Sequence, residues 1–578
     1  MGAGSASWME GRGVTTLGVL MPWLVFVVVL AVVTKPLGGY LARVFTGEPT
    51  LFDRPLGAAE ALLFRALGIQ PDDDMTARQY SRAVLVTALA WMALAFLALL
   101  LQASLPFNPE RLPGVSPLLA FNISASFVTN TNWQAYAPSL TLSDFSQFAD
   151  LGFLQFAGAA MGGAVAVAIV RALSGRRMGN FFVDLTRMCT RVLLPLAILL
   201  TVILVWQGVP DTLAPYLHVT TVTGGHQVVP RGPIASWEAA AHLTTSGGGY
   251  TGPNGASPLE NPTAASGLMG SLAMGLLPVG FFYMFGVMTG RPRQSGVLIG
   301  VGAVLFLAVG LLVFLPEDAG NPLVNALGLH GPPFNMAGKE LRFGVGGTTL
   351  FETAGAAFST GSFASAPAGV LPLASLTLLG AMFLNLVFGG VGIGLLNMLT
   401  MVVLTIFASG LMVGRMPEFL GKKIEAREVS LASLALLVHP LLILGGTAVA
   451  VDTAAGAAHH HGPLGFTQIL YAFASGAANN GSSMMAGLAA GRPFYEWAIG
   501  IEVLVARFVP LIAMLFLAEA LLGKQTVPET AGTLHTDTPL FGGVLLGTIV
   551  LAAALTYLPI VALGPVAEHY LLWVGHAL

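Results

Sequence analysis

Four short runs of small polar residues determine how this sequence is interpreted: TNTNWQ at 129–134, TSGGGY at 245–250, STGSF at 359–363 and NNGSS at 479–483. They lie roughly 115 to 120 residues apart, and each is placed between two long apolar runs. The moderately apolar stretches before them, 118–128, 237–244, 349–358 and 467–476, are too short to cross a bilayer as helices. We therefore predict four re-entrant helices, each leading into one polar run.

The residue types in these runs suit a small monovalent cation. A dehydrated ion needs oxygens in place of its water, and backbone carbonyls along a narrow path supply them. Glycine permits the backbone such a path requires, and Ser, Thr and Asn add oxygens that suit K⁺ or Na⁺ rather than a transition metal. No Asp or Glu occurs in the runs, which favours a singly charged ion. One run alone could be a glycine-rich turn, but four in register predict a filter.

The predicted filter residues, where the cation would bind, are Thr129, Asn130, Thr131, Asn132, Gln134, Thr245, Ser246, Gly247, Gly248, Gly249, Ser359, Thr360, Gly361, Ser362, Asn479, Asn480, Gly481 and Ser482.

The composition places the chain in a membrane. Of its 578 residues 55% are hydrophobic and 9% charged, and the mean hydropathy is +0.78, which is too apolar for a soluble protein of this length. Ten apolar runs are helix candidates: 17–34, 83–103, 149–171, 189–207, 268–289, 295–315, 373–413, 430–451, 495–521 and 541–563. We read the first as an uncleaved span rather than a signal peptide.

The seventh run is the ambiguous one, because its 41 residues could form one broken helix or two spans. With one span, 18 of the 25 Lys and Arg residues fall on one side of the membrane, as the positive-inside rule expects. We therefore predict ten spans, with both termini outside the cytoplasm. The segments at 35–82 and 414–428 are then the longer cytoplasmic loops and candidate docking sites for a partner, or simply topology-setting charges.

The predicted fold is an all-α integral membrane protein with ten transmembrane helices, in which four membrane-pore-membrane repeats are arranged pseudo-fourfold around a selectivity filter. Residues 1–82 would hold the first span and a cytoplasmic loop, and residues 541–578 the last span and an external tail. The four repeats would occupy 83–173, 189–290, 295–414 with a broken second helix, and 430–521.

Two features inside the spans are functional candidates. Glycines crowd the segment with Gly389, Gly390, Gly392 and Gly394, and so many would break a helix. Broken backbone at membrane depth is tolerated where it lines a watery cavity, so we predict a gating loop, with close helix packing as the alternative. Arg507 in the ninth span would be costly unless paired or hydrated, and we expect it to brace the filter or line its cavity, with snorkelling as the alternative.

Other chemistries find little support. The chain has one cysteine, Cys189, and no basic face for nucleic acid, because its net charge of −3 is spread thinly. It has no GxxxxGK[ST] phosphate loop, no Asp-Lys-Thr-Gly phosphorylation sequence and no large cytoplasmic segment for a nucleotide domain. We therefore predict a protein that is not an enzyme and has no organic cofactor or transition metal.

The sequence resembles the potassium-binding (A) subunit family of the Kdp potassium-transporting P-type ATPase, within the superfamily of potassium transporters, over nearly its whole length. The resemblance is carried by KPLG at 35–38, LFRALG at 63–68, SFVTNTNWQ at 126–134, GGG at 247–249 with ENPT at 260–263, GKE at 338–340 with RFG at 342–344, FGGVG at 388–392, and GR at 414–415 with PE at 417–418 and LGKKI at 420–424. It implies ATP-driven, high-affinity potassium import across a bacterial cytoplasmic membrane.

In such a complex, potassium would enter from outside, pass the filter and reach the catalytic subunit through an intersubunit tunnel. The implied partners are that P-type ATPase subunit, which hydrolyses ATP, a single-span accessory subunit, a small lipid-like subunit and membrane lipid. The sequence departs from the family in three places. Asn385 stands where the glycine cluster is usually preceded by Glu, neutral residues at 364–369 replace an acidic stretch, and we interpret Gly481 in the fourth run as displaced from the usual Asn-Asn-Asn-Gly-Ser pattern.

Two other functions remain open. A stand-alone potassium or sodium transporter of the same superfamily, driven by ion gradients, would share the four repeats without needing a catalytic partner. An integral-membrane enzyme would need clustered His, Asp or Glu within its spans, and the sequence has no such cluster.

Overall fold

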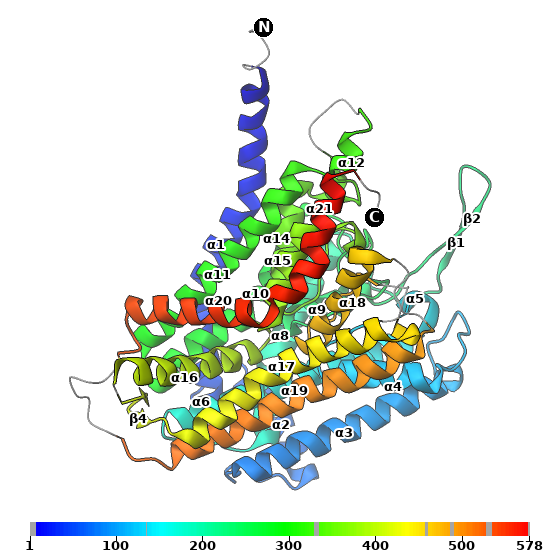
Figure 1. The fold of residues 1–578 in the computed structure, drawn as a ribbon. Helices are drawn as coiled ribbons and strands as arrows, with labels where there is room; N and C mark the ends of the chain where they lie inside the picture. Colours follow the sequence, from blue (N-terminus) through cyan, green and yellow to red (C-terminus); the bar gives the residue numbers. More distant parts are fainter. Residues whose placement is uncertain are drawn as a thin grey trace.

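The structure is a computed structural model that describes residues 7–134, 136–328, 334–414, 416–456, 461–485, 491–526 and 535–575. Almost all of the regular structure is helical (Figure 1). The long helices are α1 (Ser7–Thr46), α3 (Ala77–Leu101), α6 (Gly152–Leu173), α8 (Leu194–Trp206), α10 (Ala264–Thr289), α11 (Pro292–Ala319), α16 (Ile393–Val413), α17 (Ala426–Asp452), α19 (Pro493–Leu522) and α20 (Pro539–Val561).

Ten helical segments of the described chain are long and apolar enough to cross a membrane, as predicted. Several are longer than their apolar runs. The first span continues to Thr46 rather than ending at residue 34, because Lys35 and Pro36 lie inside α1. Short π-helical turns extend three others: Phe145–Leu151 precedes α6, Met188–Leu193 joins α7 (Phe181–Arg187) to α8, and Ala562–Val566 joins α20 to α21 (Ala567–Trp573). The chain is therefore a multi-pass membrane protein.

Local sequence signals set several helix ends. Thr76 and Gln79 form a capping box at the start of α3, and Thr263 and Ser266 form another at the start of α10. Gly290 ends α10 in the left-handed conformation, with φ of 68°. These local signals fix where α3 begins and where α10 begins and ends.

Four shorter helices lie between the spans: α4 (Pro117–Val128), α9 (Ile234–Thr244), α14 (Gly344–Ala357) and α18 (Gly462–Ala477). They contain all four stretches that the sequence predicted as pore helices, except that the third ends one residue early, at Ala357. Each also packs against a helix that follows a different one of the four, α4 on α19, α9 on α6, α14 on α10 and α18 on the short helix α15 (Pro372–Phe383). The four contacts close a ring around the centre of the molecule.

The seventh apolar run is one broken helix. α15 ends at Phe383 and α16 begins at Ile393, and only α16 is long enough to count as a span. Between them the backbone takes positive φ at Asn385, Phe388, Gly389 and Gly392, which no continuous helix allows. The prediction of one span with an internal break is confirmed.

The remaining elements are small. Helices α2 (Asp53–Leu67), α5 (Pro138–Thr141), α12 (Pro322–Asn325) and α13 (Lys339–Arg342) lie in connecting segments. Two antiparallel hairpins, β1 (Leu217–Thr220) with β2 (His226–Val229) and β3 (Glu418–Phe419) with β4 (Lys422–Lys423), were not predicted. The first projects from the molecule beyond the helices (Figure 1).

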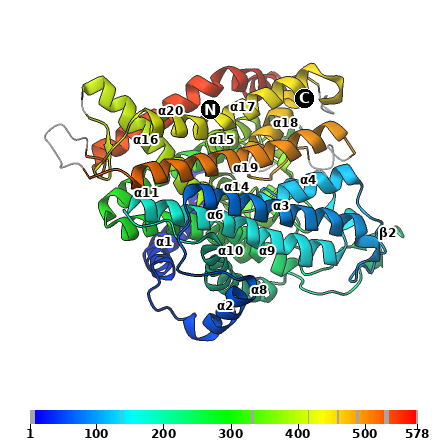
Figure 2. The ribbon, with the colours of Figure 1, turned by 90° about the horizontal axis from the view of Figure 1, so that it is seen from below.

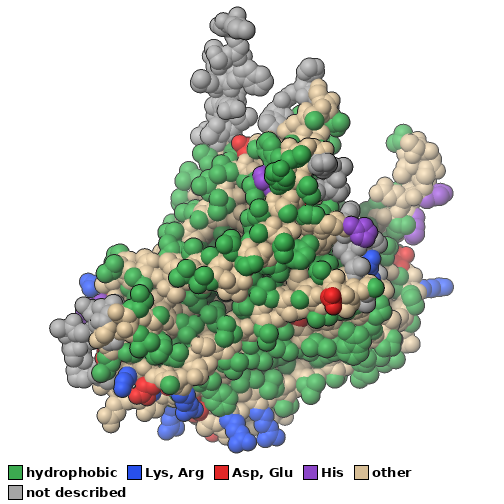
Figure 3. Space-filling view, in the orientation of Figure 1, with side chains coloured by type: hydrophobic (Ala, Val, Ile, Leu, Met, Phe, Trp, Pro, Cys, Tyr) green, Lys and Arg blue, Asp and Glu red, His purple; other side chains and the backbone are tan. Residues whose placement is uncertain are grey.

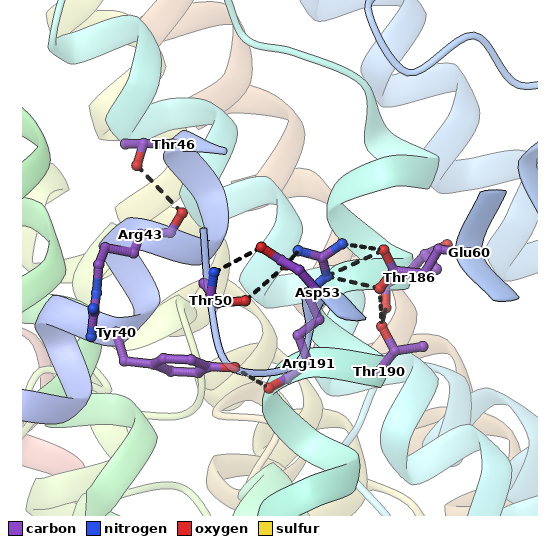
Figure 4. A network of polar contacts seen from close by, with 9 residues as sticks. All are labelled: Tyr40, Arg43, Thr46, Thr50, Asp53, Glu60, Thr186, Thr190 and Arg191. Carbon is purple, nitrogen blue, oxygen red and sulfur yellow. Dashed lines mark hydrogen bonds and ion pairs between the residues drawn. The ribbon is translucent and has the colours of Figure 1, made fainter. Parts of the chain in front are cut away.

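Hydrophobic side chains cover most of the face seen in Figure 3, and most of its Lys and Arg side chains gather along its lower edge. Seen from below, α2 projects beside α8 and α10, on the side opposite α16 and α20 (Figure 2). It is held there by charge. Arg191 pairs with Glu60 and Asp53 of α2 and, through its backbone carbonyl, accepts a 2.6 Å hydrogen bond from the Tyr40 hydroxyl (Figure 4).

Candidate functional site

The four short helices end in the same way. The residue after each helix or its last turn has left-handed backbone, and the next N–H donates to the carbonyl five residues earlier, which is the Schellman arrangement. The left-handed residues are Asn130, Thr245, Ser359 and Asn479, with φ of 62°, 52°, 53° and 50°. The hydrogen bonds run from Thr131 to Ser126, Ser246 to Ala241, Thr360 to Gly355 and Asn480 to Ser475, at 2.8 to 3.0 Å. All four polar runs therefore leave their helices in one register.

This register settles the position of the glycine in the fourth run. Gly481 follows the left-handed Asn479 by two residues, as Gly361 follows Ser359, and both glycines have positive φ. The displacement of Gly481 from the family pattern stays a prediction, because this geometry compares only the runs of the same chain. The third and fourth runs place their glycines alike.

The first and second runs are joined by hydrogen bonds. The Gly247 N–H donates to the Thr131 carbonyl at 3.1 Å. The Gln134 amide donates to the Gly249 carbonyl at 3.0 Å, and the Asn130 amide donates to the Thr244 carbonyl at 2.8 Å. These bonds fix the two runs side by side.

The fourth run closes against the others. The Asn479 amide donates to the Thr131 hydroxyl at 2.8 Å, and the Asn480 amide donates to the Gly355 carbonyl at 2.9 Å. A Cβ on Gly361 would overlap the Asn480 carbonyl oxygen, and a Cβ on Gly481 would overlap that of Thr131. Glycine is needed at both positions because these backbones approach so closely.

All four runs meet at one cavity. Its lining includes Gln134 of the first run, Gly248 of the second, Gly361 of the third, and Gly481 and Ser482 of the fourth. Residues far apart in the sequence, predicted only from their composition, are thus brought to one place.

Several oxygens of these runs have no hydrogen-bond partner. Within the described chain, the carbonyl oxygens of Thr360, Gly361, Asn480 and Gly481 accept no hydrogen bond. The Thr360 and Ser362 hydroxyls and the Asn132 amide are also buried without a partner among the described residues. Buried oxygens without a donor are costly, and a bound cation would offset that cost.

Not every predicted filter residue offers its carbonyl. The Trp237 indole donates to the Gly248 carbonyl at 3.2 Å, and the Asn254 amide donates to the Ser246 carbonyl at 3.2 Å. The Thr129 hydroxyl is hydrogen-bonded to the Thr131 hydroxyl at 2.9 Å. These hydrogen bonds hold the polar runs in place.

The glycine-rich break lies directly against the filter. Asn385 accepts a 2.8 Å hydrogen bond from the Ser359 hydroxyl and donates to the Ala478 carbonyl at 3.0 Å, so it bridges the third and fourth runs. The Val391 N–H donates to the Thr245 hydroxyl at 3.0 Å. The break is therefore tied to three of the four segments that end in left-handed residues.

Glycine is required in the break for packing as well as for φ. A Cβ on Gly390 would lie 3.0 Å from the Thr245 hydroxyl oxygen, and one on Gly392 would lie 2.8 Å from the Gly162 carbonyl oxygen of α6. A Cβ on Gly394 would overlap the Phe388 carbonyl. At these glycines the backbone itself packs against the neighbouring residues.

Arg507 is buried, 5% exposed, and points at α6 rather than toward a lipid surface. It donates to the Gly158 carbonyl at 3.1 Å, and Gly158 packs against Asn130 of the first run. This placement agrees with a bracing position and contradicts snorkelling. Glu502, also buried, has no hydrogen-bond partner for either carboxylate oxygen among the described residues.

Sequence reasoning missed the groups that hold the external segments. Glu260 accepts hydrogen bonds from the Thr251 and Gly255 N–H groups, at 2.7 and 2.9 Å, and so fixes the loop after the second run. Burial raises the pKa of Glu260 to about 7. Lys339 pairs with Glu317 at 2.5 Å, and neither side chain is exposed. Glu260 and Lys339 lie in the ENPT and GKE stretches that carry the family resemblance, which was the available signal.

Comparisons with known proteins agree on one family. The family described as "Potassium-transporting ATPase A subunit" matches residues 24–570. A potassium-transporting ATPase potassium-binding subunit from Alicyclobacillus acidocaldarius is 45% identical over 553 residues, covering 94% of this chain and 98% of its own. Those from Delftia acidovorans and Rhizobium rhizogenes are 44% and 43% identical, covering 95% and 96% of this chain and 98% of their own.

Among solved structures, the potassium transporter TrkH from Vibrio parahaemolyticus aligns over 75% of this chain and 84% of its own, with 18% identity and a TM-score of 0.48. The family match and the identity of the relatives extend over nearly the whole chain, including all four polar runs. The chain therefore belongs to the potassium-transporting ATPase A subunit family.

Proposed function

We propose that this chain binds potassium at the four polar runs and passes it inward as the potassium-binding subunit of an ATP-driven importer. The observation that carries the proposal is the convergence of the four runs on one cavity, with buried, unpartnered oxygens in the runs that line it. The relatives are named as potassium-transporting ATPase potassium-binding subunits, which supports the choice of ion.

The four units act as pseudo-fourfold repeats around the filter, within the predicted boundaries 83–173, 189–290, 295–414 and 430–521. The ring of contacts among α4, α9, α14, α18 and their neighbouring long helices supports this arrangement. So does the shared left-handed residue at the end of each short helix.

Neutral oxygens give the filter its preference. Carbonyl and hydroxyl dipoles compensate one positive charge without a fixed negative charge. Potassium enters at the mouth beside Gln134 and Gly248 and exchanges its water for filter oxygens. Below the runs it meets the break at 384–392, whose bonds to Ser359, Thr245 and the Ala478 carbonyl must change before the ion can pass. Arg507 holds α6 against the first run during this change.

The chain itself does not hydrolyse ATP. It carries neither nucleotide-binding nor phosphorylation motifs, so the energy comes from a P-type ATPase subunit that receives the ion through a tunnel between subunits. A single-span accessory subunit and a small lipid-like subunit complete the assembly in the bacterial inner membrane. In this proposal both termini lie outside the cytoplasm, which is supported by the gathering of Lys and Arg side chains along one edge (Figure 3), because such charges favour the cytoplasmic side.

The test is rubidium uptake in a bacterium without its own potassium uptake systems, with this chain expressed alone or with the catalytic and accessory subunits. We expect uptake only with the partners. Gly248→Asp should abolish it, because a Cβ there overlaps the Asn132 carbonyl and the side chain adds a charge to the filter. Gly252→Asp is the matched control, since it adds the same charge at the cavity lining where a Cβ meets no atom within 4 Å.

Uptake by the chain alone would favour the second candidate, a gradient-driven transporter. Equal uptake by the two variants would contradict the assignment of the filter.

A further inference from the structure

A second cavity lies on the outer surface of the helical bundle, between α1, α10 and α11. Its volume is about 320 Å³, at the lower end of the range for ligand pockets. The lining is almost wholly apolar, and it includes Val27 and Leu307, which are 39% and 50% exposed. Because these helices are spans, the cavity opens toward the bilayer rather than toward water.

The inner wall of this cavity is formed by Phe358 and Phe388. Phe358 directly precedes the left-handed Ser359 of the third run, and Phe388 directly precedes Gly389 of the break. Their rings stack with centroids 5.8 Å apart, and Phe358 stacks in turn on Phe306 at 5.4 Å. A molecule in the cavity therefore touches the residue that precedes the third run and a residue of the break itself.

Polar groups also line the cavity. Lys35 and Tyr283 are part of the lining. Gly38 lies one turn after Lys35, where α1 crosses α10 so closely that an added Cβ would lie 2.6 Å from the Cβ of Tyr283. Lys35 is exposed and follows the apolar run of α1, where an ammonium group can reach lipid headgroups. Two other apolar cavities, one along α8 and α9 and one beside α15 and α21, have no Lys or Arg in their linings.

We propose that this cavity binds an anionic phospholipid, with one acyl chain against Phe306, Phe358 and Phe388 and the phosphate beside Lys35 and Tyr283. The apolar lining and the single cationic group match the two parts of such a molecule. The bilayer around the spans supplies it. Binding of this lipid does not depend on transport. An acyl chain in the cavity would nevertheless contact Phe388 and so support the break.

The experiment is native mass spectrometry of the full chain in detergent, with phosphatidylglycerol or phosphatidylcholine added. Wild-type protein should retain one phosphatidylglycerol more firmly than any phosphatidylcholine. Lys35→Gln should lower this preference about fivefold, the size expected for one lysine at an anionic surface. Ala303→Trp should remove the retained lipid, because Ala303 lines the cavity.

Matched controls separate the site from general lipid binding. Val304→Trp adds the same bulk at the next residue of α11, which is 52% exposed and outside the lining, and Arg43→Gln removes an exposed charge from the same helix as Lys35. Both should retain lipid as the wild type does, and thermal unfolding in the same detergent confirms that each variant is folded. Retention by folded Ala303→Trp equal to that of Val304→Trp would overturn the proposal, as would a protein helix found in the cavity of the assembled complex.

Discussion

Gly481→Ala is the sharpest perturbation of the proposed filter. Gly481 has φ of 86°, where a residue with a Cβ pays about 1–2 kcal/mol. The added Cβ would also overlap the Thr131 carbonyl oxygen and lie 2.8 Å from the Gly247 Cα. An ordinary contact begins at 3.4 Å, so the fourth run must move from the second by about 0.6 Å. The distance between a bound ion and its oxygen ligands can vary by only about 0.2 Å. The ion therefore loses oxygen ligands next to Gly481.

The overlap acts on the filter in addition to the backbone cost, and a loss of only about 1.4 kcal/mol in ion binding corresponds to a tenfold change in an equilibrium constant. We therefore expect Gly481→Ala to raise the half-saturating rubidium concentration for uptake at least about tenfold, measured with the partner subunits present and normalised to protein in the membrane. Gly491→Ala is the control. It has nearly the same φ, 69°, but a Cβ there meets nothing within 4 Å, so it carries the backbone cost without the overlap.

If Gly481→Ala and Gly491→Ala show the same half-saturation and the same maximal rate, the close contact of the runs does not set ion binding, and the reasoning fails.

Three further outcomes are expected. Gly390→Ala, whose Cβ would press on the Thr245 hydroxyl, should change the ratio of rubidium moved to ATP hydrolysed by the complex, and an unchanged ratio would count against a gate. Arg191→Met should lower the free energy of unfolding by about 3–5 kcal/mol, because it leaves buried Glu60 unpaired, and Glu60→Gln in the same chain should restore much of it in thermal melts. Burial alone would raise the pKa of Glu60, but the hydrogen bonds and charge of Arg191 lower this pKa below 4.5. The stability that the ion pair contributes is therefore present above pH 4.5 and is lost as the pH falls further. Thermal melts of Glu60→Gln should lack this loss of stability at low pH.

Much of the fold could be predicted because it depends on composition along the chain. A residue in lipid must satisfy its backbone within its own helix, so each span is an apolar run of about 20 residues that hydropathy detects. The break in the seventh run could be predicted equally well, because clustered glycines lower helix propensity wherever they occur. The four polar runs were found by residue type and spacing, and all of them meet at the cavity.

The partners of these residues could not be predicted. Asn385 binds the third and fourth runs, and Arg507 binds α6 some 349 positions away in the chain, yet neither sequence neighbourhood indicates such a contact. Their geometry depends on which helices pack together, and hydropathy carries no information about that choice.

The sequence by itself determined that this protein lies in a membrane, crosses it ten times and carries four oxygen-rich runs. Only the tertiary structure decided the common register of the runs, the place of Gly481 and the contact of the break with the filter. The physical reason is that burial in lipid acts on each segment independently, whereas close approach of backbones, as between Gly481 and Thr131, is a property of pairs of segments.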